Sequence, residues 1–169
     1  MECPQPVAMA RARAAALWLR VDLRLDDNEA LRAAATGETL LPVFVFEREK
    51  FNRPSLAGAR KSSARRARFL LESVDCLRRN LERAGSGLAV AMGRPEEVLP
   101  ELCQGCLVTV TKGFCSEEQR EEHLVGKRLR ASGSELRSHW GGTLYMPEDC
   151  GQDPAATPLL FTSFRNKAI

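Results

Sequence analysis

Short strand-like segments alternate with amphipathic segments along this chain of 169 residues. The apolar runs are too short for helices and have the length of buried strands. The second run is rich in β-branched and aromatic residues, and its Pro42 fits best near the start of a strand. The pattern predicts strands at 14–21, 39–46, 87–92, 106–111 and 135–140.

Four segments between these strands carry helical signals. Asn28 is a good N-cap for a short helix that continues through Leu31. The longest helix is predicted from about Ala64 to Ala84, with Gly85 ending it. Its apolar stripe recurs at helical spacing and consists of Leu70, Val74, Leu77 and Leu81.

The other two helices are predicted from their first turns. Pro95, followed by two acids, suits the start of a short helix. Ser116 and Gln119 predict a capping box for a helix from Glu117 to Ala131. Five strands alternating with four helices predict an α/β fold, a five-stranded parallel doubly wound (Rossmann-like) sheet with helices on both faces.

This pattern divides the chain into three parts. Residues 1–13 are expected to be a disordered tail, 14–140 the α/β domain, and 141–169 a connector without a periodic segment. In parallel sheets, ligands bind beyond the carboxyl ends of the strands. The segments to watch are therefore Arg20 to Asp27, Glu47 to Lys50 and Lys112 to Cys115. No GxGxxG follows the first strand, so a dinucleotide site of that type is not expected.

Composition narrows the class of protein without identifying its function. Apolar residues make up 44% and charged residues 28%, which is typical of a globular protein. The net charge of +3 does not by itself indicate nucleic-acid binding. The segment from Gly58 to Arg68 holds cations and no acid. It is either a phosphate or nucleic-acid patch or a solvated loop, and charge runs favour the loop.

Six cysteines, at positions 3, 76, 103, 106, 115 and 150, form no regular framework. This suits reduced thiols in an intracellular protein. Cys103 and Cys106 have the spacing of metal and redox sites, but no second ligand pair accompanies them. We therefore predict no metal site. No apolar run approaches the length of a membrane span, so no membrane partner is expected.

The segment LWLRVDLRLDDNEAL resembles the opening signature of the photolyase/cryptochrome family, R-x-D-L-R-x-x-D-N-x-A-L. Further segments resemble later elements of the same family, in order: LPVFVFE, RARFLLESVDCLRRNLERAGSGLAVAMGRPEEVLPEL, WGGTLYMPEDC and LLFTSFRNKAI. The last two are typical of the cryptochrome DASH branch. The resemblance covers the chain from about Ala14 to Ile169.

The resemblance implies a protein with two domains, of which this chain is the N-terminal one. A larger helical domain, absent here, would bind FAD and DNA, so catalytic residues are not expected in this chain. The complete protein would be a monomer that uses blue light to repair pyrimidine dimers, favouring single-stranded DNA, or a photoreceptor. Its location would be intracellular, in the nucleus or cytoplasm, with import into an organelle left open.

The first turn has two interpretations within this family. Asp22, Asp26 and Asp27 precede a helix N-terminus, where carboxylates complement the helix dipole. Arg20 and Arg24 can form bidentate pairs with acids of the same turn. We interpret these five residues as a network that fixes the turn and docks the neighbouring domain. Direct contact with a ligand is the alternative.

The resemblance also implies an antenna site for methenyltetrahydrofolate between the two domains. In related DASH proteins the loop after the fourth strand is similar to H-K-E-T-C-S-E-E, and its first Glu helps hold the folate. Here the loop is TKGFCSEE, so the candidate half-site consists of Lys112, Gly113, Phe114, Cys115 and Glu118. Gly113 replaces the Glu, which removes a carboxylate for the polar edge of a pterin, although Phe114 can stack on one.

Two other functions remain open on the sequence alone. The chain can be a free-standing, non-catalytic α/β module that binds a nucleotide or a partner, or an inactive truncated isoform. The apolar PLLF segment near the C-terminus favours a domain with something to pack against. Trp18 and Trp140 are expected to be core or domain-contact residues rather than electron relays.

Overall fold

The computed structural model describes residues 14–52, 58, 62–143, 146, 149 and 158–168. The predicted tail at 1–13 and most of the predicted connector lie outside these residues. The strands are β1 Ala14–Leu19, β2 Thr39–Phe46, β3 Ala89–Met92, β4 Leu107–Thr111 and β5 Glu135–His139. The helices are α1 Glu29–Ala34, α2 Arg48–Asn52, α3 Ala64–Arg83, α4 Pro95–Leu102, α5 Ser116–Ala131 and α6 Phe161–Ala168.

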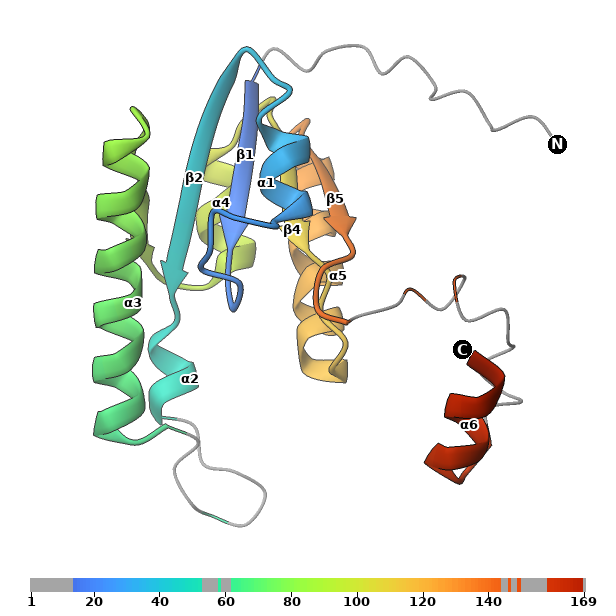
Figure 1. Ribbon diagram of the computed structural model, residues 1–169. Helices are drawn as coiled ribbons and strands as arrows, with labels where there is room; N and C mark the ends of the chain where they lie inside the picture. Colours follow the sequence, from blue (N-terminus) through green and yellow to red (C-terminus); the bar gives the residue numbers. More distant parts are fainter. Residues whose placement is uncertain are drawn as a thin grey trace, which may run out of the picture.

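All five strands are parallel and lie in the order β3-β2-β1-β4-β5. Figure 1 labels β2, β1, β4 and β5 of this order. β1 occupies the centre, where Ala16 is paired with Leu41 on one side and Val108 on the other. The chain first builds outward through β2 and β3, and then crosses back to place β4 on the free side of β1. This confirms the predicted α/β class and five-stranded parallel sheet.

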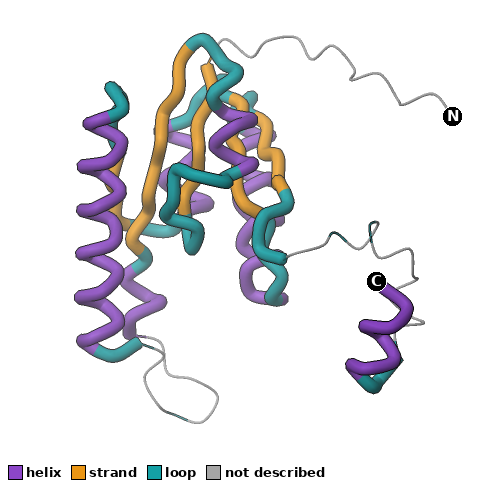
Figure 2. The backbone as a smooth tube through the Cα atoms, in the orientation of Figure 1, coloured by secondary structure: helices purple, strands orange, loops and turns teal. Residues whose placement is uncertain are grey.

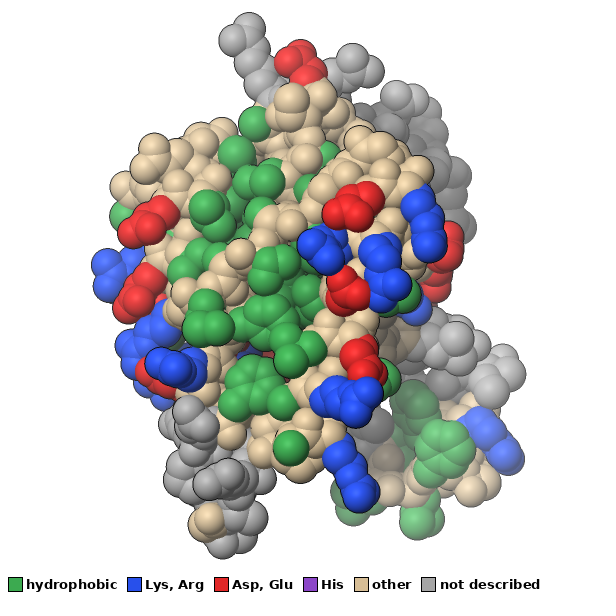
Figure 3. All heavy atoms as spheres, turned by 90° about the vertical axis from the view of Figure 1, so that its left-hand side faces the viewer, with side chains coloured by type: hydrophobic (Ala, Val, Ile, Leu, Met, Phe, Trp, Pro, Cys, Tyr) green, Lys and Arg blue, Asp and Glu red, His purple; other side chains and the backbone are tan. Residues whose placement is uncertain are grey.

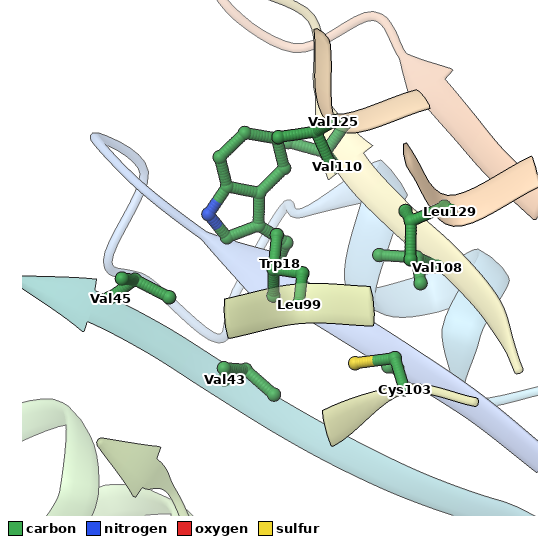
Figure 4. Packing of buried hydrophobic residues seen from close by; sticks show 10 residues of the cluster. Trp18, Val43, Val45, Leu99, Cys103, Val108, Val110, Val125 and Leu129 are labelled. Atoms are coloured by element: carbon green, nitrogen blue, oxygen red, sulfur yellow. The ribbon is translucent and has the colours of Figure 1, made fainter. Parts of the chain in front are cut away.

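Helices cover both faces of the sheet (Figure 2). On one face, buried residues of α1 and α3 pack with Leu17 and Phe44. On the other face, α4 and α5 pack around Trp18, which is 2% exposed (Figure 4). Alternate residues of β1 therefore serve two separate cores, and this is why the strand is apolar without interruption.

Local signals fixed the ends of two helices as predicted. Asn28 caps α1, and its Oδ1 accepts a hydrogen bond from the backbone N of Leu31 at 2.9 Å. α3 is capped by Ser63 and is followed by Gly85 at a φ of +80°. Three residues of the predicted stripe of α3 (Val74, Leu77 and Leu81) are buried, and Leu70 is partly buried against them.

The predicted capping box of α5 is wrong. The helix begins at Ser116, so the N-cap is Cys115 and the residue that reaches back is Glu118. Its carboxylate accepts from the backbone N of Cys115 at 3.3 Å. Gln119 instead donates to the carbonyl of Phe114 at 3.4 Å. The sequence allows two capping boxes one residue apart, Ser116 with Gln119 and Cys115 with Glu118. The second one forms because the carboxylate of Glu118 is a stronger hydrogen-bond acceptor than the amide of Gln119.

Two helices were not predicted. α2 is a short helix directly after β2, and its Lys50 pairs with Glu121 of α5 at 2.9 Å. α6 contradicts the expectation that 141–169 has no periodic segment. Phe161 and Phe164 lie one turn apart with ring centroids 6.4 Å from each other, a pair spacing that a helix provides. The described residues thus contain six helices instead of the four expected.

Candidate functional site

The sheet has its topological switch point between β1 and β4, because β2 lies on one side of β1 and β4 on the other. A cleft of about 980 Å³ lies at the carboxyl ends of the strands. Its lining includes two of the three segments singled out from the sequence, the turn after β1 and the segment after β2, together with α3 and the first turns of α5.

The cleft has an apolar wall and a charged floor. Phe44 and Phe46 of β2 contribute to the wall, with ring centroids 4.8 Å apart, and Phe69 of α3 contributes from the facing helix. The floor carries Arg20, Glu47, Lys50 and Glu121. An apolar wall with a few convergent polar groups is the usual form of a small-molecule site.

Arg20 is the centre of the charged floor. It pairs with Glu121 at 3.3 Å and with Glu122, and it donates to the carbonyl of Thr111 at 2.8 Å. The three side chains are only 10–12% exposed. Its guanidinium also lies 4.7 Å from the centre of the Trp18 ring, a cation–π distance.

The prediction that Arg20 pairs with acids of its own turn is wrong. Its carboxylate partners lie about a hundred residues downstream, on α5. Sequence reasoning missed Glu121 and Glu122 because they sit in an ordinary amphipathic helix. Only one signal in the sequence could have identified them. They lie one turn after the start of a capped helix that follows the end of β4.

Lys50 joins the segment after β2 to the same network. It contacts Glu47 and lies 2.9 Å from Glu121. Burial raises the pKa of Glu47 to about 7, and Glu121 adds to this, while Lys50 opposes it. Burial lowers the pKa of Lys50, but hydrogen bonds to the two carboxylates outweigh it and leave the pKa raised. These pairs hold α2 against α5 across the floor of the cleft.

The raised pKa of Glu47 predicts a pH-dependent stability. A carboxyl that binds its proton more tightly when folded destabilises the native state once that proton is lost. The contribution of Glu47 to the free energy of unfolding should therefore fall as pH rises from 4.5 to about 7 and then level off. Urea unfolding at about pH 5 and about pH 8 should show a smaller fall in Glu47→Gln than in the wild type.

The comparison with Glu47→Gln is needed because His139 changes the stability with pH in the opposite direction. Burial lowers the pKa of His139, so unfolding takes up a proton there as pH falls. The contribution of His139 to the free energy of unfolding therefore decreases as pH falls. This partly offsets the opposite pH dependence of Glu47 in the wild type. Equal pH dependence in wild type and Glu47→Gln would contradict the prediction.

The rest of the turn after β1 pairs locally, as predicted. Arg24 Nε lies 3.0 Å from Asp22, and Arg24 also lies 3.7 Å from Asp27. Burial raises the pKa of Asp22 despite the opposing effect of Arg24. Asp27 has a positive φ of +49°, and Asp26 is exposed. Asp26 and Asp27 therefore face outward, whereas Asp22 is partly buried and lines the cleft together with Arg24.

The predicted half-site for folate lies at the neighbouring strand end. Lys112 Nζ lies 5.2 Å from the Trp140 ring, and the Phe114 ring meets Trp140 edge-on with centroids 4.9 Å apart. Gly113 donates its backbone N–H to Glu122 at 2.6 Å. Cys115 is exposed, and Glu118 accepts from the loop backbone. Trp140, which donates to Thr143 at 2.6 Å, joins this corner, whereas Trp18 is in the core.

Cys103 and Cys106 lie at the opposite end of the sheet, before β4. Burial raises the pKa of Cys103 to about 12 and also raises that of Cys106. Such thiols stay protonated and unreactive. Among the described residues, none of the helices combines the length and apolar character needed to span a bilayer.

Comparison with known proteins places this geometry in a family. A family model described as DNA photolyase matches residues 15–169. The chloroplastic/mitochondrial cryptochrome DASH of Arabidopsis thaliana is 37% identical over 155 residues, which cover 88% of this chain and 27% of that protein. The cryptochrome DASH of Gloeobacter violaceus is 38% identical over 156 residues, covering 89% and 31%.

A solved structure agrees with the sequence relatives. The crystal structure of the Synechocystis sp. PCC6803 cryptochrome superposes with a TM-score of 0.85 at 31% identity and covers 94% of this chain and 34% of that one. The chain thus spans roughly a third or less of the length of these relatives. With the family model, the DASH relatives and the fold in agreement, the chain belongs to the DNA photolyase family and corresponds to its N-terminal α/β domain.

Proposed function

We propose that this domain serves a blue-light-driven flavoprotein of the cryptochrome DASH type. The complete protein would repair cyclobutane pyrimidine dimers in single-stranded DNA or act as a photoreceptor. FAD and DNA would be held by a helical domain beyond the residues of this chain. The FAD cofactor would carry the light-driven chemistry. The observation that carries the proposal is the match to DASH proteins, which extends over nine-tenths of this chain but less than a third of theirs.

The surface of the domain supports a partner of this kind. Leu159, Leu160 and Phe161 are 71–104% exposed at the start of α6. The outward-facing part of the first turn, with Arg24 and Asp27, provides charges at the end of the sheet. Exposed apolar side chains and paired surface charges are each typical of interfaces. We propose that both segments dock the FAD-binding domain, which would make the complete protein a monomer of two domains.

The location of the protein is part of the same proposal. Cys76, Cys103, Cys106 and Cys115 are free thiols, which suits a reducing compartment. We propose an intracellular location. The Arabidopsis relative is named chloroplastic/mitochondrial, and this favours testing import into an organelle as well as the nucleus and cytoplasm.

A second candidate function is a free-standing α/β module that binds a small ligand or a partner without catalysis. The cleft of about 980 Å³ favours it, because a site of this size with a charged floor does not need a second domain. The two functions differ in what the isolated chain should do. A domain that lacks its partner should self-associate through its apolar surface, whereas a free-standing module should be monodisperse.

The decisive experiment reads the native transcript beyond the codon for Ile169. We expect an open reading frame that continues into a helical domain. That domain, expressed separately and mixed with this chain, should raise the thermal midpoint of the chain and convert self-associated material into a one-to-one complex. A stop codon directly after Ile169, together with a monodisperse chain, would overturn the light-driven function and favour the binding module.

A further inference from the structure

The loop between β4 and α5 is closed by the chain's own carboxylates. Three successive backbone N–H groups point to acceptors within the protein. Gly113 donates to Glu122 Oε1 at 2.6 Å, while Phe114 and Cys115 donate to Glu118 Oε2 at 3.1 and 3.3 Å. Consecutive N–H groups of this kind form an anion-binding concavity at the start of a helix. Here the concavity is already filled.

Gly113 permits this closure because its backbone passes very close to the first turn of α5. A Cβ at position 113 would lie 2.4 Å from the Cβ of Glu118 and 2.8 Å from its Oε2. It would also lie 3.0 Å from Glu122 Oε1. A side chain at this position would have to displace the helix turn as well as the carboxylate. The glutamate expected from the family's loop therefore does not fit here.

The two aromatic rings of the corner are held against each other and the backbone, with Phe114 40% exposed. The Phe114 ring lies over Gly142, where a Cβ would come within 2.4 Å of ring atom Cε2. One edge of the ring is directed at Trp140, and Lys112 occupies a cation–π position on that tryptophan. The rings that could stack on a planar ligand thus contact each other and the backbone instead.

We infer that this loop does not hold a pterin, and that Gly113, Glu118 and Phe114 together fill the half-site that the family would use for folate. The inference rests on the proposed function in one respect, namely that folate is the antenna cofactor implied by the family. The closure itself is a property of the described residues. A protein built on this domain would collect light without a folate at this loop.

The closure predicts a specific coupling between Gly113 and Glu118. In the wild-type background, Gly113→Ala should lower the thermal midpoint by about 4–10 °C, because an added Cβ overpacks the loop against α5. Gly113→Glu, which restores the family residue, should lower it at least as much. In a Glu118→Gly background, which removes both the Cβ and the carboxylate, Gly113→Ala should have little further effect. Glu117→Gly is the matched control background, because it removes the same charge from the same turn and leaves Glu118 in place.

The second measurement uses the ligand itself. Equilibrium dialysis of the wild-type chain against methenyltetrahydrofolate should leave no bound ligand at one-to-one stoichiometry, and the same should hold after addition of the helical domain. Bound folate in either sample would overturn the inference, as would equal effects of Gly113→Ala in the Glu118→Gly and Glu117→Gly backgrounds. Neither the variant series nor the dialysis of the chain alone depends on whether the transcript continues, so failure of the proposed function and failure of this inference are distinguishable.

Discussion

Replacing Arg20 with methionine should lower the free energy of unfolding of this domain by about 3–5 kcal/mol. The substitution keeps an apolar stem of similar length but leaves Glu121 and Glu122 without their shared cation. Both carboxylates are nearly buried, with side chains 12% and 11% exposed, so water screens their charges poorly, and only Glu121 keeps another cation partner among the described residues, Lys50 at 2.9 Å. Removing one partner from a buried ion pair costs far more than the pair itself contributes, because a charge remains uncompensated. Urea unfolding monitored by circular dichroism measures the change.

Two control variants separate charge from packing. Arg32→Met removes an arginine whose pair with Glu29 lies on the surface, and it should leave the free energy of unfolding nearly unchanged. Adding Glu122→Gln to Arg20→Met should recover part of the loss by removing one uncompensated charge. If the double variant is no more stable than Arg20→Met alone, the buried charge is not the cause and the proposed network is wrong.

Trp18→Ala should have a comparable effect, with a loss of about 3–5 kcal/mol. The indole is 2% exposed and packs among Leu99, Val110 and Val125, so its removal leaves a large cavity between the sheet and the two helices behind it (Figure 4). The ring also supports the guanidinium of Arg20 at 4.7 Å. The effects of Trp18→Ala and Arg20→Met should therefore not add, because the two residues share a contact.

The other tryptophan provides the matched comparison. Trp140→Ala, at the partly exposed corner beside Phe114, should cost much less than Trp18→Ala, because no buried cavity results. The two variants also assign the intrinsic fluorescence, since the chain has only these two tryptophans. Similar losses from both substitutions would contradict the assignment of Trp18 to the core.

Local signals predicted most of the fold. The stripe from Leu70 to Leu81, the cap at Asn28 and the stop at Gly85 all act within a few residues, and the structure confirms each of them. Errors appeared where two local solutions compete. The N-terminus of α5 offered two caps one residue apart, and the structure selects Cys115 and Glu118. α6 was missed because its two phenylalanines follow a segment rich in Gly and Pro.

The candidate site was predicted less completely, for a physical reason. Parallel strands bring their carboxyl ends together, so the positions of Arg20, Lys50 and Lys112 at one end of the sheet followed from the strand pattern. Their partners did not, since Glu121 and Glu122 become neighbours of Arg20 only after the chain has crossed the sheet. The closeness of Gly113 to the side chains of Glu118 and Glu122 likewise arises from how the loop packs on α5, and no residue pattern encodes it.

The exposed edge of the sheet at β3 also affects whether the isolated domain associates with other copies. Val90 and Met92 of β3, which are 48% and 70% exposed, lie at one end of the strand order. Phe69 and Leu71 of α3 are exposed as well. Figure 3 shows apolar side chains gathered on this side of the molecule, where α3 lies. An unpaired, apolar edge strand is a common starting point for association between chains.

The central position of β1 sets the order in which the domain can be completed during synthesis. β1 pairs with β2 soon after both leave the ribosome, but its other neighbour, β4, begins about 60 residues after β2 ends. At about 5–20 residues per second, the unpaired side of β1 waits for roughly 3–12 seconds. During this interval a nascent chain carries its most apolar strand with one row of backbone groups unsatisfied. The unpaired side of β1 is therefore the part of the nascent domain that is open to non-native strand pairing until β4 emerges.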